Sequence, residues 1–365
     1  MDKKVSRLFA AGAVAALAFG AAACGGGSDS SGSGNDGGGS GKIGLLLPET
    51  KTARYESFDR PLITKRIKEL CKDCEVDYQN ADQDANKQLS QGEAMLNEGV
   101  KVLVLDAVDT KAAGALTAKA KAKNVPVLAY DRLAEGPVDY YVSFDNFNIG
   151  VQQGKAILEG VKKGGDPKRG EIVMINGSPT DPNAADFKKG AHSVLDGQVN
   201  IGKEYDTPDW SPDKAQSEME GAISALGKDK IIGVYAANDG TAGGAIAAMK
   251  AAGIKKLPPV TGQDAEVTGI QRVLTGEQYA DIYKEYKPQA KTAGEMAVAL
   301  LQGKKYPQAN KKVNNGSSDV PSVFIPANAI TRDQIKDTII KDGIWKASDL
   351  CKGDAAPDCK DLGIS

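Results

Sequence analysis

Polar side chains follow the apolar runs of this chain at the points where strands are expected to end. Asp131 and Arg132 follow Val127–Tyr130, and Asp264 and Lys284 follow two later runs. Carboxylates accept hydrogen bonds, while guanidinium, ammonium and amide groups donate them, so such a set can bind the hydroxyl groups of a neutral polyol. An aromatic ring can cover the apolar C–H face of the same ligand. The chemistry predicted is ligand binding, and the candidates are Arg54, Tyr55, Asp131, Arg132, Asp145, Asn183, Trp210, Asn238, Asp264 and Lys284.

A structural explanation competes with this one at each single position. Asp and Asn directly after a strand often serve as turn or helix N-cap residues. Asp106 and Asp109 are expected to form such a turn, and Asp84 is expected to cap a helix. Repetition of the same polar character at one strand end after another favours a shared ligand over a series of unrelated caps.

The composition excludes several other kinds of site. His192 is the only histidine, so every site that needs two histidines is excluded. No Gly-x-Ser-x-Gly elbow and no G-x-x-x-x-G-K-[ST] phosphate loop is present. Lys and Arg number 46 against 48 Asp and Glu, a net charge of −2, which argues against a nucleic-acid partner. Asp82, Asp84 and Asn86 have the spacing of a calcium loop, but Lys87 stands where that loop needs glycine. We therefore expect neither a metal nor a cofactor.

Short apolar runs alternate with longer amphipathic stretches from residue 42 onward. Strands are expected at residues 43–47, 75–78, 102–105, 127–130, 140–144, 172–176, 201–205, 231–236, 260–261 and 279–283. Helices are expected at residues 87–97, 111–123, 150–161, 184–195, 212–226, 242–252, 268–274 and 289–301. This alternation predicts parallel sheets, which bind ligands at the carboxyl ends of their strands. It runs for about 240 residues, too long for one sheet, and breaks at residues 145–148. Two α/β domains are therefore expected, with a single (β/α)₈ barrel as the alternative.

The first 41 residues have the composition of a targeting segment. Basic residues at positions 3, 4 and 7 precede an Ala-rich apolar run that ends in three alanines and Cys24. Residues 1–24 are predicted to be a signal peptide with a lipobox in which Cys24 is lipidated, ordinary secretory cleavage being the alternative. Residues 25–41 contain only Gly, Ser, Asp and Asn and are predicted to be a flexible linker. The expected location is extracytoplasmic, anchored by lipid to the outer face of the cell membrane.

Four cysteines remain besides Cys24. They are Cys71, Cys74, Cys351 and Cys359, an even number that suits two disulfides in an exported protein. Cys71 and Cys74 form a C-x-x-C, which a redox centre or half of a zinc site would also use. Because the motif ends an expected helix, the redox interpretation is disfavoured. Structural disulfides are expected, with the pairing left open.

Several segments resemble a known family. They are LAYDRL (128–133), YYVSFDN (140–146), NGSPTDPNA (176–184), AANDGTAGGAIAAM (236–249), VTGQDAE (260–266), VPSVFI (320–325) and IKDTIIKDG (335–343). In this order they resemble the periplasmic sugar-binding proteins of ABC importers, and among those the D-xylose-binding branch. The resemblance covers most of residues 42–350. It implies an α/β fold of two Rossmann-like lobes with parallel sheets, joined by three hinge crossings, the type I periplasmic binding protein fold.

The resemblance also implies a role for each candidate. In the first lobe, Arg54 and Tyr55 would form a lip, and Asp131 and Arg132 would bind ring hydroxyls. Asp145 would contact the ligand beside the first crossing. The second lobe would supply hydrogen-bonding groups and an opposing aromatic ring, from Asn183, Trp210, Asn238, Asp264 and Lys284. Two positions depart from the family pattern: Tyr55 replaces a tryptophan and Glu285 replaces a proline.

The crossings implied by the resemblance divide the chain. They lie near residues 145–146, 284–286 and 314–316, so the N-terminal lobe comprises residues 43–146 and 286–314. The C-terminal lobe comprises residues 147–285 and 315–350, followed by a tail at residues 351–365. The implied ligand is a monosaccharide, and D-xylose is the favoured one. The implied receptor is a monomer that delivers this sugar to ABC permease subunits in the membrane.

Three other functions are compatible with parts of this pattern. The ligand could be another sugar, such as ribose, glucose or galactose. An extracytoplasmic sugar-processing enzyme would need an acid–base pair, for which Asp131 and Asp264 are the candidates. The effector domain of a repressor shares the fold, but the signal peptide and the missing helix-turn-helix count against it.

Overall fold

The computed structural model describes residues 40–364, and the candidate lipidation site Cys24, the signal peptide and most of the linker lie outside them. The first lobe has the strands β1 (Lys42–Leu47), β2 (Glu75–Asn80), β3 (Val102–Leu105), β4 (Val127–Tyr130), β5 (Tyr140–Phe144), β11 (Lys311–Asn314) and β12 (Asp319–Ile325). Its helices are α1 (Arg60–Leu70), α2 (Ala85–Asn97), α3 (Ala113–Ala122) and α9 (Tyr286–Leu301), and a π-helical turn η1 (Tyr55–Asp59) precedes α1.

The second lobe repeats the strand–helix alternation. Its strands are β6 (Glu171–Asn176), β7 (Asn200–Asp206), β8 (Ile231–Ala236), β9 (Thr261–Gln263), β10 (Ala280–Lys284) and β13 (Ala327–Ile330). Its helices are α4 (Asn146–Gly164), α5 (Pro182–Leu195), α6 (Pro212–Leu226), α7 (Asp239–Ala251), α8 (Val267–Thr275), α10 (Ala347–Leu350) and α11 (Ala356–Asp361). Shorter helical turns are η2 (Pro208–Trp210), η3 (Lys228–Lys230), η4 (Arg332–Gln334), η5 (Lys336–Ile340) and η6 (Gly353–Ala355). Nothing in residues 40–364 is a helix with the length and apolar character that a membrane span requires.

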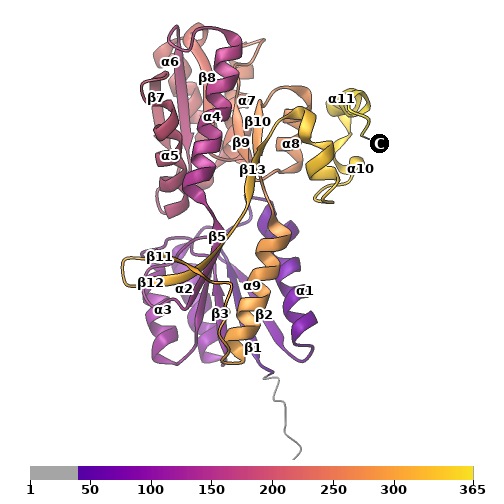
Figure 1. Ribbon diagram of the computed structural model, residues 1–365. Coiled ribbons are helices and arrows are strands. Elements are labelled where there is room, and N and C mark those ends of the chain that lie inside the picture. The colour runs from indigo at the N-terminus through magenta and orange to yellow at the C-terminus, as the bar shows by residue number, and fades with distance from the viewer. Residues whose placement is uncertain (1–39, 365) are drawn as a thin grey trace, which may run out of the picture. The chain divides into compact units, whose positions relative to one another are not determined.

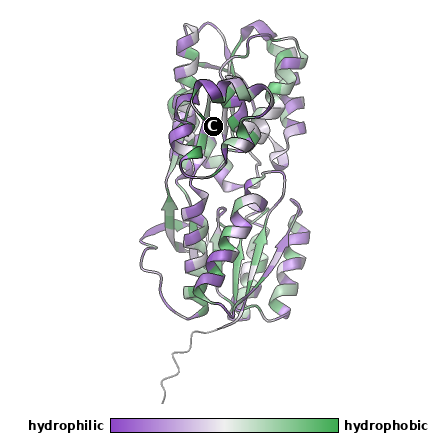
Figure 2. Cartoon of the chain, turned by 90° about the vertical axis from the view of Figure 1, so that its right-hand side faces the viewer, coloured by the Kyte–Doolittle hydropathy of each residue, from purple (hydrophilic) through white to green (hydrophobic). Residues whose placement is uncertain are grey.

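The first sheet is covered by helices on both faces, which explains its continuous apolar strands. Its order is β11-β12-β5-β4-β3-β1-β2, with Ile43 of β1 beside Val102 of β3 in parallel register. Alternate residues of β3 face opposite sides of the sheet. Val102 and Val104 pack in the cluster that includes α1 and α9, whereas Leu103 and Leu105 pack with α2 and α3. Figure 2 shows the central strands of this sheet as hydrophobic, and hydrophilic residues interspersed with hydrophobic ones along the helices.

The second sheet is built in two sections. Their orders are β7-β6-β8 and β13-β10-β9, joined by a parallel bridge between Val234 and Val260. The strands β6, β7, β8, β9 and β10 pair in parallel register, whereas β13 pairs with β10 in antiparallel register. The chain therefore forms two open, mostly parallel α/β sheets, as expected, and the barrel alternative is wrong.

The chain passes between the lobes at three places. It leaves the first sheet after β5 at Asp145 and returns through Glu285, between β10 and α9. Contrary to the expectation that residues 315 onward belong to the second lobe, β12 pairs with β5 inside the first sheet. The third crossing therefore lies at Pro326, between β12 and β13, and not at residues 314–316. Figure 1 shows β12, late in the chain, lying next to β5.

The C-terminal segment is packed rather than a free tail. Leu350, Cys359 and Ile364 are buried in one cluster with Ile270 and Leu274 of α8. Disulfides join Cys71 to Cys74 at the end of α1, and Cys351 to Cys359 in this segment. Both expected disulfides form, and the pairing left open by the sequence is local in both cases. That they are structural rather than redox-active stays a prediction.

Candidate functional site

Side chains from the carboxyl ends of both sheets enclose one small cavity. It is lined by Thr52, Arg54, Tyr55, Asp131, Arg132, Asp181, Asn183, Phe187, Trp210, Gln263, Asp264 and Lys284. Its volume is about 20 Å³, room for about one water molecule. Three cations and three carboxylates contribute to the lining, so their formal charges sum to zero. A neutral polar ligand matches such a lining better than an ion.

Arg54 is held on all sides within the first lobe. Its Nε lies 2.8 Å from Asp59 Oδ2, and one terminal nitrogen donates to Gln289 Oε1 at 2.9 Å. The other lies 3.2 Å from Asp131 Oδ1. The guanidinium carbon is 4.6 Å from the centre of the Tyr286 ring. With only 2% of its surface exposed, Arg54 is a fixed wall of the cavity rather than a mobile lip.

Asp131 lies at the centre of the site because of its backbone as well as its side chain. Its φ is 57°, a left-handed conformation in which the chain turns sharply after β4. The carbonyl oxygen of Asp131 accepts hydrogen bonds from the hydroxyls of Tyr141 and Ser143. Burial by itself would raise the pKa of the carboxyl, but Arg54, Lys284 and Arg132 outweigh it and lower the pKa to about 2. Asp131 is therefore an ionised hydrogen-bond acceptor and a poor general acid.

The second lobe contributes a wall of aromatic and charged groups. Trp210 is buried, its indole N–H donates to Asp181 Oδ2, and its ring meets Phe187 edge-on at 6.4 Å. Lys284 lies 3.1 Å from Asp264 Oδ1, and its ammonium is 5.3 Å from the centre of the Phe187 ring. The aromatic faces would pack against the C–H groups of a sugar while the charged groups bind its hydroxyls.

Contacts across the cavity join the two lobes. Arg132 Nε lies 2.9 Å from Asp181 Oδ2, and the amide of Asn183 donates to the carbonyl of Asp131 at 3.1 Å. The backbone N–H of Ala53 donates to Glu266 Oε1 at 3.0 Å. A ligand held between the lobes would therefore lie where lobe–lobe contacts already form.

Eight of the ten candidates from the sequence line this cavity, and two do not. Asp145 is exposed and caps α4 by accepting from the N–H of Asn148. Asn238 is buried, but its side-chain oxygen accepts from the N–H of Thr241 and caps α7. Neither belongs to the lining. At these two positions the side chain acts as a helix N-cap, because it accepts a hydrogen bond from a backbone N–H that would otherwise be unpaired.

Sequence reasoning missed Thr52, Asp181, Phe187 and Gln263 of the lining. Asp181 caps α5 through the N–H of Asn183 and also faces Arg132. The signal that could have found it is its position two residues before Asn183 in a strand-end loop, since that loop was already assigned to the site.

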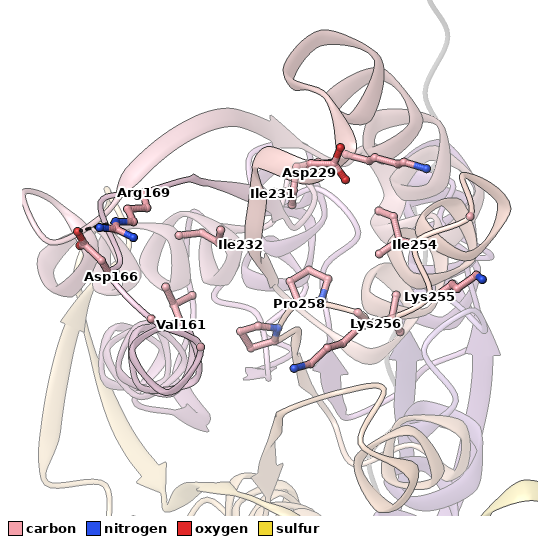
Figure 3. A pocket seen from close by; sticks show the side chains of 16 residues that line it. Val161, Asp166, Arg169, Asp229, Ile231, Ile232, Ile254, Lys255, Lys256 and Pro258 are labelled. Atoms are coloured by element: carbon pink, nitrogen blue, oxygen red, sulfur yellow. Dashed lines mark ion pairs between the residues drawn. The ribbon is translucent and has the colours of Figure 1, made fainter.

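A second, larger hollow lies elsewhere on the second lobe (Figure 3). Its volume is about 630 Å³, and Val161, Ile231, Ile232 and Pro259 form part of its floor. Ile231 is the first residue of β8, so this hollow lies at the amino ends of the strands. Parallel sheets bind ligands at the opposite ends, and we do not assign the site there. Within residues 40–364 no group of three or more His, Cys, Asp or Glu side chains could hold a metal ion.

Comparison with known proteins defines the class. The pattern of the periplasmic binding protein domain family matches residues 43–305, well over half of the chain. The protein therefore belongs to the periplasmic binding proteins, a family of solute-binding proteins rather than of enzymes.

The relatives include proteins with named ligands. The chain is 37% identical to the D-xylose-binding periplasmic protein of Escherichia coli strain K12 over 85% of this chain and 92% of that protein. It is 35% identical to the D-xylose-binding periplasmic protein of Haemophilus influenzae over 83% of this chain and 90% of that one. A crystal structure of an ABC transporter solute-binding protein from Clostridium phytofermentans with bound β-D-glucose has a TM-score of 0.78 and 30% identity. That similarity covers 85% of this chain and 99% of the other.

Proposed function

We propose that the protein is an extracytoplasmic receptor that binds a monosaccharide between its two lobes and delivers it to an ABC importer. The favoured ligand is D-xylose. The observation that carries this proposal is the lining of the small cavity. Its charges balance, its donors and acceptors come from both lobes, and Trp210 and Phe187 provide aromatic surface. The names of the two relatives at 35–37% identity favour D-xylose as the ligand.

Eight lining residues are proposed as ligand contacts. They are Arg54, Tyr55, Asp131, Arg132, Asn183, Trp210, Asp264 and Lys284. The aromatic groups would cover the sugar ring, and the charged and amide groups would bind its hydroxyls. With its pKa lowered to about 2, Asp131 stays ionised and would accept hydrogen bonds from the sugar hydroxyls.

Anchoring belongs to the same proposal. Cys24, preceded by three alanines, would carry the lipid, and residues 25–41 would tether the binding lobes to the outer face of the membrane. Mass spectrometry of the protein extracted from membranes tests this directly. Release of a Cys24→Ser variant from the membrane fraction is expected, and its retention there would contradict the anchor.

A hexose is the second candidate ligand because the Clostridium phytofermentans structure holds β-D-glucose. Titration calorimetry of the purified protein with xylose, ribose, arabinose, glucose and galactose decides between them. One-to-one binding of xylose with much weaker hexose binding is expected. Stronger binding of glucose would correct the ligand and keep the receptor, whereas no heat with any of the five would contradict the proposed function.

A further inference from the structure

Asp106 is a fully buried carboxylate directly behind the cavity. It follows β3 at the carboxyl end of the first sheet, has 0% exposure, and does not line the cavity itself. Neither of its carboxylate oxygens has a hydrogen-bond partner in the part of the chain that the structure describes. Its backbone is fixed, since its N–H donates to Leu46 and its carbonyl accepts from Gln88. A buried, unpaired carboxylate is unfavourable, so its position calls for an explanation that a strand-end turn does not supply.

The nearest cation to Asp106 is shared with the opposite lobe. Arg132 Nε lies 3.7 Å from Asp106 Oδ1 and 2.9 Å from Asp181 Oδ2. Yet this Nε makes a hydrogen bond to neither carboxylate. The terminal nitrogens of Arg132 donate within the first lobe, to the carbonyl of Ala107 and the hydroxyl of Tyr55. The guanidinium is therefore held in the first lobe, with one nitrogen between a carboxylate of each lobe.

The two carboxylates differ in what else they bind. Asp181 accepts from the indole of Trp210 and from the N–H of Asn183, so its oxygens are satisfied without Arg132. Among residues 40–364, Asp106 has only Arg132 as a cation within 4 Å. Burial raises the pKa of Asp106 well above its usual range, and the charge of Arg132 opposes that rise, so the negative charge of Asp106 depends on Arg132 staying beside it.

Separation of the lobes changes this balance. A cavity of about 20 Å³ enclosed by buried side chains does not admit a sugar, so a sugar enters only when the lobes part. Asp181 then moves away with the second lobe, while Asp106 stays beside Arg132 on the first. The Arg132–Asp106 pair is thus favoured with the lobes apart, and the Arg132–Asp181 pair with the lobes together.

We propose that Asp106 is a positioning residue that competes with Asp181 for Arg132, and that this competition limits how firmly the lobes close on the ligand. The proposal rests on the sugar-binding function proposed above. A receptor must release what it binds, and Asp106 keeps the closed form from becoming too stable. Removing the charge of Asp106 is expected to favour closure, and removing the charge of Asp181 to oppose it.

Two neutral variants test this with opposite expected signs. Asp106→Asn removes the competing charge at constant shape, and Asp181→Asn is the matched control on the other side of Arg132. Stopped-flow tryptophan fluorescence, to which the buried Trp210 contributes, measures sugar dissociation. Asp106→Asn is expected to slow dissociation about fivefold and Asp181→Asn to speed it by at least the same factor. In the double variant, Asp106→Asn is expected to lose its effect, because Asp181 no longer carries a charge that competes with position 106 for Arg132.

A ligand-free readout separates this proposal from the proposed function. Small-angle scattering without sugar should find Asp106→Asn more compact than wild type and Asp181→Asn more extended. If the wild type binds sugar but Asp106→Asn dissociates as fast or faster and is no more compact, the competition is overturned and the receptor stands. If no sugar binds but the scattering shift is seen, the competition stands and the proposed function falls. Asp106→Ala, neutral and too small to clash, replaces Asp106→Asn if thermal unfolding shows that the amide does not fold.

Discussion

Lys284 Nζ lies 3.1 Å from Asp264 Oδ1, and 3% of Lys284 and 5% of Asp264 is exposed. Lys284 ends β10, where the chain leaves the second lobe, and Asp264 follows β9 with a φ of 91°. The ion pair thus holds the strained loop after β9, which carries Asp264, against the end of β10, where the chain crosses to the first lobe. Because both groups also line the cavity, ligand binding and the geometry of this crossing depend on the same two side chains.

Lys284→Met is expected to abolish measurable sugar binding. The variant keeps the length of the side chain but leaves Asp264 buried without its cation, and breaking a buried pair in this way costs about 3–5 kcal/mol. Affinity measured by calorimetry should fall more than about 100-fold. Lys256→Met removes an exposed lysine of the hollow in Figure 3 and should bind like wild type. Near-normal affinity of Lys284→Met would remove Lys284 from the site.

Gly177→Ala is expected to weaken binding by displacing Trp210. A Cβ at position 177 would lie 2.0 Å from the Trp210 ring, a distance that no side chain tolerates. The indole must shift, which disturbs its hydrogen bond to Asp181 and the aromatic wall of the cavity. We expect at least about a tenfold loss of sugar affinity by titration calorimetry.

Gly221→Ala is the control for that substitution. Gly221 lies in α6, is exposed, and a Cβ there would meet only the Tyr205 hydroxyl at 3.8 Å. Alanine in a helix is more favourable than glycine by about 0.5–1 kcal/mol, so this variant should be slightly more stable with unchanged affinity. Equal affinities of Gly177→Ala and Gly221→Ala would show that Trp210 does not contact the sugar.

The central parallel strands of both sheets could be predicted because their residues are mostly apolar on both faces. Val102–Leu105 is buried at all four positions and has no competing interpretation as a loop. Of the missed strands, β11 is polar, β12 contains Pro321, and β13 is four residues long with two alanines and an asparagine, all of which disfavour a strand assignment. The strands β12 and β13 pair with β5 and β10, which lie far earlier in the chain, and β11 joins the sheet only through β12. Local pattern alone cannot indicate such pairing, and the third crossing was misplaced for that reason.

The site could be predicted in part for a related reason. A polar residue after a parallel strand either caps the next helix or faces the ligand, and sequence does not separate the two roles. Asp145 and Asn238 cap their helices and lie outside the lining, Asp131 lies at its centre, and Asp181 caps a helix and lines the cavity. The outcome depends on the direction of the backbone after each strand. At Asp131 a positive φ turns the chain into the cavity.

Stability is expected to fall as the pH rises from about 5 to about 8. Burial first, and then the charge of Asp239, raise the pKa of Glu266 from 4.5 to about 8. Burial likewise raises the pKa of Asp59 to about 6, although Arg54 opposes it. The folded protein therefore binds more protons than the unfolded chain in this range, and folding free energy is lost as pH passes through the folded-state pKa values.

Glu266→Gln isolates the larger of these two contributions. The amide cannot ionise, and its oxygen can still accept the hydrogen bond from Ala53. Melting temperatures measured from pH 5 to pH 8 should fall less for this variant than for wild type, by at least about 2 °C. Glu277→Gln, a surface carboxylate paired with Lys250, serves as the control and should follow the wild-type curve. Parallel curves for wild type and Glu266→Gln would contradict the assignment.

Trp345→Ala is expected to weaken sugar binding although Trp345 does not line the cavity. Its indole N–H donates to the carbonyl of Ala265, next to Asp264, and its ring meets Phe58 edge-on at 4.9 Å. Phe58 belongs to η1, the turn that carries Tyr55 in the other lobe. Trp345 therefore joins the C-terminal segment to both sides of the site. The lost aromatic contact and hydrogen bond are each worth about 1 kcal/mol, so affinity should fall roughly 10- to 30-fold.

A double-mutant cycle with Phe58→Leu decides whether this effect acts between the lobes. If the aromatic contact transmits it, the two substitutions together should weaken affinity by less than the product of their separate effects, because each removes the same contact. Trp345→Phe keeps a ring against Phe58 but removes the donor to Ala265, so it should lose only part of the affinity. If the losses of sugar affinity in Phe58→Leu and Trp345→Ala multiply fully in the double variant, the contact with Phe58 does not transmit the effect. Trp345 would then act within the second lobe alone, through the loop that carries Asp264.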